Sequence, residues 1–435
     1  MSVDNSELLM LLGGKKSKST IGIAGQQGFG VGVYGGSSSD LKAMGLKPMS
    51  GCFNPASDNY GNYIHTNGSI MCCIPAFCYR LGNASAPSYS RDGEDALEIR
   101  DATEFSQFSN DAAFSSPDFG DGWILHRAFV DGNKLKSAFF IDKYLCSNVN
   151  SQAASVKNAD WLICYNDTSQ TFFTSSITGK YGSSFDAVTL SRARGDYYSL
   201  VTCYQWSAIS LLSLAHGQAA TSADACAWYD ANHITNFPKG ATAGGIRDYN
   251  DNTIKYTPHA SEKTLAKTGS GTPFNKTTHN GQASGVADVA GMGQQWTIGA
   301  SIHVRKTIAL LKTSVTAHEI TEETVTRSHL HNSYEFSFSG GGSTYFKGIR
   351  KGTKELEWEG AGILPRDTTK STLFGEDGYY GDSEANNGLR VGLGYAWNEP
   401  AGIFCRAWSR DSYASGTWGS QGYGDYAFRA AAYPP

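Results

Sequence analysis

Apolar residues in this chain fall in short runs separated by clusters of Gly, Ser, Asn and Asp. Such runs, bounded by turn-forming residues, predict β-strands. Residues 68–80 predict one buried strand, in which Pro75 indicates an edge or a bulge. Residues 123–134 and 137–146 predict a β-hairpin across a Gly-Asn turn at residues 132–133. We therefore expect a mainly β protein.

One stretch has helical periodicity instead. Between residues 196 and 216 the apolar residues recur at helical spacing, which predicts a helix that stops at Gly217. A second, short helix is predicted over residues 223–232. The apolar face of the first helix is expected to hold Leu200, Tyr204, Ala208, Leu211, Leu212 and Ala215. We interpret Trp206 and Trp228 as core residues rather than ligand contacts.

The last part of the chain alternates apolar or aromatic runs with Gly, Ser, Asp and Asn. Three strands are predicted there, over residues 388–397, 404–410 and 422–431. Their turns carry large rigid side chains, which lose little conformational entropy on binding and dominate recognition surfaces. The candidate receptor-binding residues are Tyr395, Trp397, Trp408, Arg410, Tyr413, Trp418 and Tyr423. For Trp397 and Trp408, packing within the sheet is an equally good interpretation.

Composition supports a loop-rich, largely β protein. Among 435 residues there are 50 Gly and 12 Pro, and only 17% of the residues are charged. This length can bury a sizeable core in one or two domains. The formal net charge of −4 offers no footprint for a polyanion, so we expect no nucleic-acid partner. No run reaches the about 20 apolar residues of a membrane span, so we expect no membrane insertion.

The nine cysteines cannot all pair within one chain, and none shows the paired spacing of a zinc site. Cys72, Cys73 and Cys78 are close in sequence, but neighbouring strand residues face opposite sides and no His lies beside them. We interpret these three as buried thiols. His329 and His331 alternate as on one strand face, but without a third ligand we interpret them as part of a polar loop.

The chain is expected to divide near residue 119. Residues 1–20 are a possible attachment segment, with a partly ordered terminus as the alternative. Residues 21–119 are predicted to form a β-rich N-terminal domain. It opens on a Gly-rich stretch that lacks the Gly-Lys-Ser/Thr of a phosphate-binding loop, so strand and turns are predicted there. Residues 120–435 form the second expected domain, with an insertion loop at about 236–280.

Three segments near the end of the sequence resemble one family. They are residues 390–397 (Arg-Val-x-x-Gly-x-x-Trp), 405–410 (Cys-Arg-x-x-x-Arg) and 428–431 (Phe-Arg-x-Ala). In this order they are similar to the ending of the C-type-lectin-like fold. Formylglycine-generating (sulfatase-modifying) enzymes share that fold with the major tropism determinants of phages. The resemblance implies an α+β fold, mainly β with few short helices, in which residues 120–435 form the lectin-like domain.

A fourth segment resembles another motif of the same family. Residues 279–282 read His-Asn-Gly-Gln and lead to Asp288, as in the family's His-Asn-Gly-Gln motif followed by Asp-x-x-Gly-Asn-Val-Trp-Glu-Trp. In several members this region contributes to a calcium site. Here Met292 stands in place of the Asn, and Gln294 and Gln295 in place of Trp and Glu. We therefore expect no cofactor, with calcium left open as an alternative.

The resemblance also allows a test for catalysis. Formylglycine-generating enzymes hold copper with two nearby cysteines in the C-terminal segment. Aligned on Cys405, those positions fall at about Gly402 and Ala407, neither of which can supply a thiolate. The helical domain with clustered histidines that related sulfoxide synthases need is missing. No carboxylate pair or triad stands out from the sequence. We therefore expect a protein that is not an enzyme.

Other segments resemble phage tail-fibre proteins, namely residues 55–63, 129–134 and 139–144. The resemblance implies a virion receptor-binding or tail-fibre protein that recognises a protein or glycan receptor on a bacterial cell. It would be made in the host cytoplasm and act at the outer cell surface, with the N-terminal region contacting other virion proteins. Relatives work as homotrimers, which gives avidity to weak contacts. A structural virion component, such as a decoration or baseplate protein, is the alternative, and a formylglycine-generating-type oxidase is the third.

Overall fold

The computed structural model describes most of the chain up to residue 320 and shorter stretches beyond it. The described residues are 20–162, 184–232, 237–241, 246–248, 251–260, 265–303, 307–320, 330–335, 343–345, 347–350, 358–367, 378–381, 391–393, 406–408 and 426–435. They form mostly short strands, with few short helices, so the prediction of a mainly β chain is confirmed. None of the described helices is both long and apolar enough to cross a membrane.

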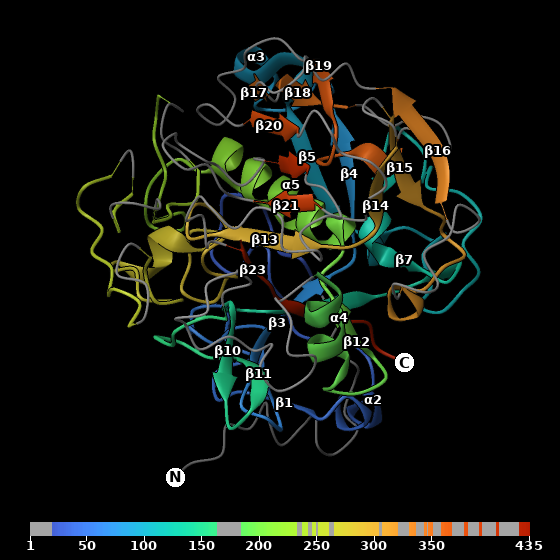
Figure 1. The fold of residues 1–435 in the computed structure, drawn as a ribbon. Coiled ribbons are helices and arrows are strands. Elements are labelled where there is room, and N and C mark those ends of the chain that lie inside the picture. The colour runs from blue at the N-terminus through green and yellow to red at the C-terminus, as the bar shows by residue number, and fades with distance from the viewer. Residues whose placement is uncertain are drawn as a thin grey trace.

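The first six-stranded sheet joins distant parts of the chain in the order β1-β2-β3-β9-β24-β12, and every pairing in it is antiparallel. Its strands are β1 (Leu46–Pro48), β2 (Asn62–His65), β3 (Ile70–Pro75), β9 (Ala138–Asp142), β24 (Ala430–Ala432) and β12 (Tyr198–Leu200). The strands β1, β3 and β12 lie in the lower half of Figure 1. Because β24 lies between β9 and β12, residues near position 430 complete a sheet that begins near position 46.

The second six-stranded sheet has the order β17-β20-β22-β21-β13-β23, and the labels of β17, β20 and β21 lie in the upper half of Figure 1. Its strands are β17 (Ser343–Tyr345), β20 (Gly378–Gly381), β22 (Arg406–Trp408), β21 (Val391–Leu393), β13 (Gln294–Thr297) and β23 (Tyr426–Ala427). The pairs β20/β22 and β13/β23 are parallel and the other pairs antiparallel. The three predicted C-terminal strands therefore exist, but the last one divides into β23 and β24, which belong to different sheets.

Smaller sheets and short helices make up the rest of the described secondary structure. The smaller sheets are β5 (Leu97–Asp101) with β4 (Phe77–Leu81) and β6 (Ile124–Leu125), β14 (Ala300–His303) with β15 (Thr307–Leu311) and β16 (Leu330–Glu335), β7 (Val130–Asp131) with β8 (Lys134–Leu135), β10 (Cys146–Val149) with β11 (Gln152–Ser155), and β18 (Lys347–Ile349) with β19 (Pro365–Asp367). The helices are α2 (Ser38–Ala43), α3 (Tyr89–Asp92), α4 (Ser184–Arg192) and α5 (Cys203–Ala219), with 3-10 turns η1 (Gly93–Asp95), η2 (Ala102–Glu104), η3 (Arg127–Phe129), η5 (Phe274–Thr277), η6 (Ala317–Glu319) and η8 (Trp358–Gly360).

The predicted Gly-Asn turn is present, but the hairpin that it closes is short. Gly132 and Asn133 both have left-handed backbone angles (φ 59° and 60°), as a two-residue hairpin turn requires. They join β7 and β8, which are only two residues long each. The strand that follows, β9, pairs with β3 and β24 instead of with residues 123–134. The prediction of one long hairpin over residues 123–146 is therefore wrong.

The predicted buried strand over residues 68–80 is two strands. β3 lies inside the first sheet, whereas β4 pairs with β5 and β6. Pro75 is the last residue of β3, where it pairs with Ala138, so it ends a strand rather than forming an edge or a bulge. Ala76 lies between the two strands, and its N–H donates to the carbonyl of Ser137. The chain changes sheets at this point.

The predicted helix over residues 196–216 is placed too early. Tyr198–Leu200 form β12, and α5 runs from Cys203 to Ala219, through Gly217 rather than stopping there. Thr202 caps α5: its hydroxyl accepts from the N–H of Gln205, whose side chain accepts from the N–H of Thr202. Every residue from Cys203 to Gln218 is buried, so α5 is surrounded by protein and has no solvent-facing side. The predicted helix over residues 223–232 is wrong, because these residues form turns.

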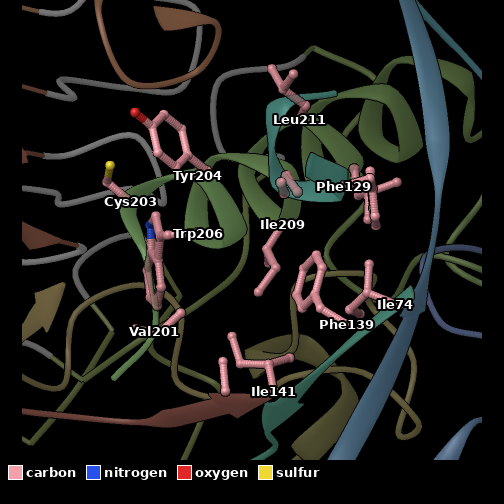
Figure 2. Close-up of a cluster of buried hydrophobic side chains, with 14 of the residues drawn as sticks. Ile74, Phe129, Phe139, Ile141, Val201, Cys203, Tyr204, Trp206, Ile209 and Leu211 are labelled. Carbon is pink, nitrogen blue, oxygen red and sulfur yellow. The ribbon is translucent and has the colours of Figure 1, made fainter. Parts of the chain in front are cut away.

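One hydrophobic core extends from Ile21 to Tyr433. Figure 2 shows side chains of α5, including Ile209 and Leu211, gathered with Phe129, Phe139 and other buried residues. Both this core and the first sheet cross the predicted boundary near residue 119, so the described residues on its two sides pack as one unit. Trp206 and Trp228 are buried, as predicted for core residues.

Seven cysteines belong to the described residues, and all seven are buried free thiols. Cys72 packs in the large core and its neighbour Cys73 in a second cluster on the other face of β3, which confirms the predicted alternation. Cys78 is also buried, so the interpretation of these three as core thiols is confirmed.

The Gly-rich stretch after residue 20 contains turns but no strand, so the prediction of strand and turns there is half correct. The possible attachment segment lies outside the described residues, except for Thr20.

Candidate functional site

Most of the predicted receptor-binding residues lie outside the described residues. These are Tyr395, Trp397, Arg410, Tyr413, Trp418 and Tyr423. Trp408 is the exception, because it is the last residue of β22, where its backbone is paired with Val391 of β21 and Gly381 of β20. The structure therefore places the backbone of Trp408 within the second sheet, and it describes the strands that flank the other candidates.

The flanking strands fix where the two candidate-bearing connections leave the second sheet. Leu393 ends β21 and pairs with Arg406, the first residue of β22, so connection 394–405 begins and returns at one end of the sheet. Connection 409–425 starts after Trp408, at the opposite end. It leads to β23, which runs in the same direction as β22. β23 therefore begins at the end of the sheet where β22 begins. The candidate residues thus belong to connections that leave from both ends of one sheet.

The His-Asn-Gly-Gln segment at residues 279–282 contacts the chain's own Gly-rich stretch. The side chains of His279, Asn280 and Gln282 all hydrogen-bond the main chain of residues 26–30. The bonds are His279 Nε2 to Gly30 O (3.0 Å), Asn280 Nδ2 to Phe29 O (2.8 Å), Gly28 N to Gln282 Oε1 (2.8 Å) and Gln282 Nε2 to Gln26 O (3.1 Å). His279 and Asn280 are fully buried. This segment therefore fixes an early part of the chain to the core.

Three buried histidines, His126, His216 and His279, have both ring nitrogens engaged. In each, Nδ1 accepts a backbone N–H, so the proton is on Nε2, which donates to an oxygen. The acceptor oxygens are Ser207 Oγ for His126, Ala225 O for His216 and Gly30 O for His279. Burial lowers the pKa of these histidines to about 3, about 4 and about 3, respectively. They stay neutral and leave no ring nitrogen available as a base.

Lys143 is a buried amine with all three donor positions used. Its Nζ donates to Asn62 Oδ1 at 2.6 Å, to Ala283 O at 2.6 Å and to Asp58 O at 3.3 Å. Burial lowers the pKa of Lys143 to about 8. Three oxygen acceptors are what an ammonium group requires, so Lys143 is charged at neutral pH and ties two surface turns to the end of β9. This arrangement is structural rather than nucleophilic.

Arg429 belongs to the segment that resembles the family's ending. It is fully buried, and it lies beside Lys143. Its guanidinium donates to four backbone carbonyls and one side chain. The acceptors are Asp142 O (3.1 Å), Lys143 O (2.9 Å), Ala287 O (2.5 Å), Asp288 O (3.1 Å) and Gln295 Oε1 (2.7 Å). Arg429 therefore links β24, β9 and β13. Its role was missed by the sequence analysis, since backbone carbonyl acceptors leave no signature in a sequence.

In the region where the resemblance allows calcium, internal hydrogen bonds engage one carboxylate oxygen of Asp288 and the side chain of Gln295, whereas Asp288 Oδ1 has no hydrogen-bond partner among the described residues. Asp288 Oδ2 accepts from Thr268 Oγ1 (2.6 Å) and from the N–H of Gly269 (2.7 Å), and burial raises its pKa. Gln295, which stands in place of the family's Glu, bonds Arg429 and the carbonyl of Asp288. Within the described ranges, no group of three or more His, Cys, Asp or Glu side chains could hold a metal ion.

The described residues line at least two surface cavities. One, of about 350 Å³, lies between the end of β4 and the turn before β6, with Asn83, Asp118 and Asp121 in its wall. Arg80 also lines it, but its guanidinium is paired with Glu98 (2.8 Å) and lies over the ring of Trp123. The other cavity, of about 200 Å³, lies beside β12 and η6.

No protein-family model matches the sequence, and no curated protein matches it.

Proposed function

We propose that this protein is a virion receptor-binding protein of the tail-fibre type, which binds a bacterial surface receptor and is not an enzyme. The observation that carries the proposal is the second sheet. Its short strands are joined by connections 394–405 and 409–425, and these carry the aromatic and Arg candidates. Aromatic residues in the segments that connect the strands of a sheet are a common feature of recognition surfaces.

The proposal includes a C-type-lectin-like fold for residues 120–435. It is supported by the order of the three segments that resemble that fold's ending. The buried position of Phe428 and Arg429 also supports it, because an ending motif of a fold should pack inward. We further propose that the protein assembles as a homotrimer in the virion and that residues before position 20 attach it to other virion proteins. Three copies would multiply weak receptor contacts.

The test is adsorption of the purified protein to intact bacterial cells, in competition with whole particles. The double substitution Tyr413→Ala and Trp418→Ala should abolish adsorption and leave the far-ultraviolet circular dichroism and the unfolding midpoint unchanged. The matched control replaces Tyr89 and Tyr229, two half-buried aromatic residues of other surfaces, by Ala. Normal adsorption by the Tyr413/Trp418 variant would place the receptor-binding surface elsewhere.

The second candidate function is a structural virion component that binds a neighbouring virion protein. The observation that favours it is Ile23, which is 64% exposed and the one large apolar side chain so exposed among the residues that the structure describes. It lies directly after the possible attachment segment. If the folded protein binds purified particles but not cells, and Ile23→Ser removes the particle binding, the structural role becomes the better explanation.

A further inference from the structure

The cavity beside β12 combines apolar walls with carboxylates. Ala431, Ala432, Tyr433 and Pro434 form one side of it, and Tyr197 lines it as well. The carboxylates are Asp131 at the end of β7 and Asp196 just before β12. Its volume of about 200 Å³ is that of one long side chain rather than of a drug-sized ligand.

Among the described residues, the side chain of Asp131 accepts one hydrogen bond and forms no ion pair. Its Oδ1 accepts from the N–H of Ala317 at 2.7 Å, the first residue of η6. The two nearest cations are engaged elsewhere, because Arg127 pairs with Glu359 and Lys136 pairs with Asp111 (2.9 Å). No described hydrogen bond or ion pair engages the second oxygen of Asp131, and Asp131 lines the cavity.

Burial raises the pKa of Asp131 to about 6, and this is the strongest effect on its carboxyl group. Arg127 and Lys136 act in the opposite direction, and Glu319 of η6 adds to the rise. At neutral pH the protein therefore keeps a charge that its surroundings disfavour. A carboxylate with a raised pKa in a cleft is a candidate binding group, since a cationic ligand would compensate the unfavourable charge.

We propose that this cavity binds a primary alkylammonium group, with Asp131 as its counter-ion and the apolar wall of residues 431–434 around its methylene stem. An alkylammonium group is compact and has three donors, which suits one open carboxylate oxygen and the nearby carboxylate of Asp196. The group is the end of a lysine side chain of a partner chain or of a small free diamine. The site does not depend on the receptor-binding role proposed above.

The remaining polar groups of the cavity are compatible with this ligand. His318 donates from Nδ1 to Tyr198 O and accepts at Nε2 from Arg192, so its ring presents no open cation to the ligand. The Lys136 ammonium is held by Asp111 and by the carbonyl of Pro434. The open charge in the cavity is therefore negative.

The test uses the full-length protein and three probes, followed by saturation-transfer difference NMR and calorimetry. The probes are Nα-acetyl-lysine N-methylamide, putrescine and, as an uncharged control, Nα-acetyl-norleucine N-methylamide. The two amines should bind with dissociation constants of about 1–10 mM, as expected for one ion pair with a short apolar stem, and the norleucine compound should not. Binding of the lysine compound alone would assign the site to a partner's lysine, and equal or tighter binding of putrescine to a free diamine.

Asp131→Asn is the decisive variant. The amide keeps an oxygen for the N–H of Ala317, so the variant should fold and be at least as stable as the parent at neutral pH. It should bind the amines at least about tenfold more weakly, which is the loss of one ion pair. For the parent protein, affinity should fall about tenfold between about pH 7.5 and about pH 5, because Asp131 becomes protonated, and this fall should be absent in Asp131→Asn.

Two further variants serve as controls. Asp196→Asn should weaken binding less than Asp131→Asn does, and Asp121→Asn, which changes an exposed carboxylate of the other cavity, should have no effect. The proposal is overturned if neither amine binds, if the norleucine compound binds equally well, or if Asp131→Asn binds as the parent does.

Discussion

The two six-stranded sheets of this protein are held in place in different ways. The first sheet collects strands from residues 46–75, 138–142, 198–200 and 430–432, and buried polar groups such as Arg429 lie where these segments meet. The second sheet is built from residues 294–427 alone, and its connections carry most of the candidate recognition residues. The two sheets therefore differ in the role of their notable side chains. In the first region a charged side chain fixes the fold, whereas in the second the side chains of interest lie on segments between strands.

The largest expected effect is on the first region. Arg429→Ala would remove the guanidinium donor from four buried carbonyls and from Gln295. Lys143 O would keep only the N–H of Ala287, and Asp288 O only the side-chain amide of Gln295. Removing one member of such a buried charged network costs about 3–5 kcal/mol of unfolding free energy. Urea unfolding followed by circular dichroism measures the change. Arg429→Lys keeps the charge but fewer of the bonds, so its loss should be smaller.

The control for this prediction is Arg100→Ala. Arg100 forms an exposed pair with Glu104 on the surface, and exposed pairs contribute less than about 1 kcal/mol. Equal losses in the Arg429 and Arg100 variants would show that the buried guanidinium does not fix the first sheet.

The next largest effect is expected from acid, which acts on three buried histidines. His126, His216 and His279 have pKa values below 6.5 in the folded protein, so between pH 7 and the folded values the unfolded chain binds protons that the folded protein cannot. Stability therefore falls as the pH drops through this window. Lowering the pH from about 7 to about 6 should cost about 2 kcal/mol for the three together. Asp131, whose pKa is raised to about 6, opposes this by only a few tenths, about 0.4 kcal/mol.

Urea unfolding at the two pH values tests this. In the variant His216→Gln the amide can still accept from the N–H of Gly25 and donate to the carbonyl of Ala225. The change in unfolding free energy between the two pH values should therefore be about a third smaller than in the parent protein. A free energy of unfolding that does not change between the two pH values would mean that these rings accept protons without loss of structure.

The smallest expected effect is on the second region. Trp418→Ala changes a residue of connection 409–425, and a substitution on a recognition segment should alter the unfolding free energy by less than about 0.5 kcal/mol. The same urea experiment measures it. A loss comparable with that of Arg429→Ala would show that Trp418 belongs to the core, and the two-region comparison would then fail.

The sequence predicts strand content well and helix position poorly. The predicted hydrophobic runs overlap β3, β4, β9 and the C-terminal strands β21 to β24, and Gly132-Asn133 identifies a turn, but strands such as β1, β2 and β12 were not predicted. For α5, the apolar pattern misleads because a fully buried helix has no solvent-facing side to mark its limits, so Leu200 of β12 looked like part of the same face. The stronger signal was the capping pair Thr202 and Gln205, which marks where the helix begins.

The candidate site was also predicted only in part from the sequence. The motif resemblance drew attention to residues 279–282 and 428–431, but it did not indicate which atoms their side chains bond. His279 and Arg429 bond backbone atoms that are far away in sequence, and such partners can be identified only in three dimensions. Asp131 was not singled out either, because the sequence shows neither its burial nor the engagement of Arg127 and Lys136 by other acids.

The position of β24 has a consequence for how the protein is made. While a ribosome synthesises the chain, β9 and β12 emerge long before Ala430–Ala432, the strand that must lie between them. Until then both strands have an unpaired edge, which can associate with other nascent chains. Folding must therefore wait for these late residues, and contacts between positions so distant in sequence form slowly. We expect the yield of soluble protein to depend strongly on growth temperature and on chaperones that protect the unfinished sheet.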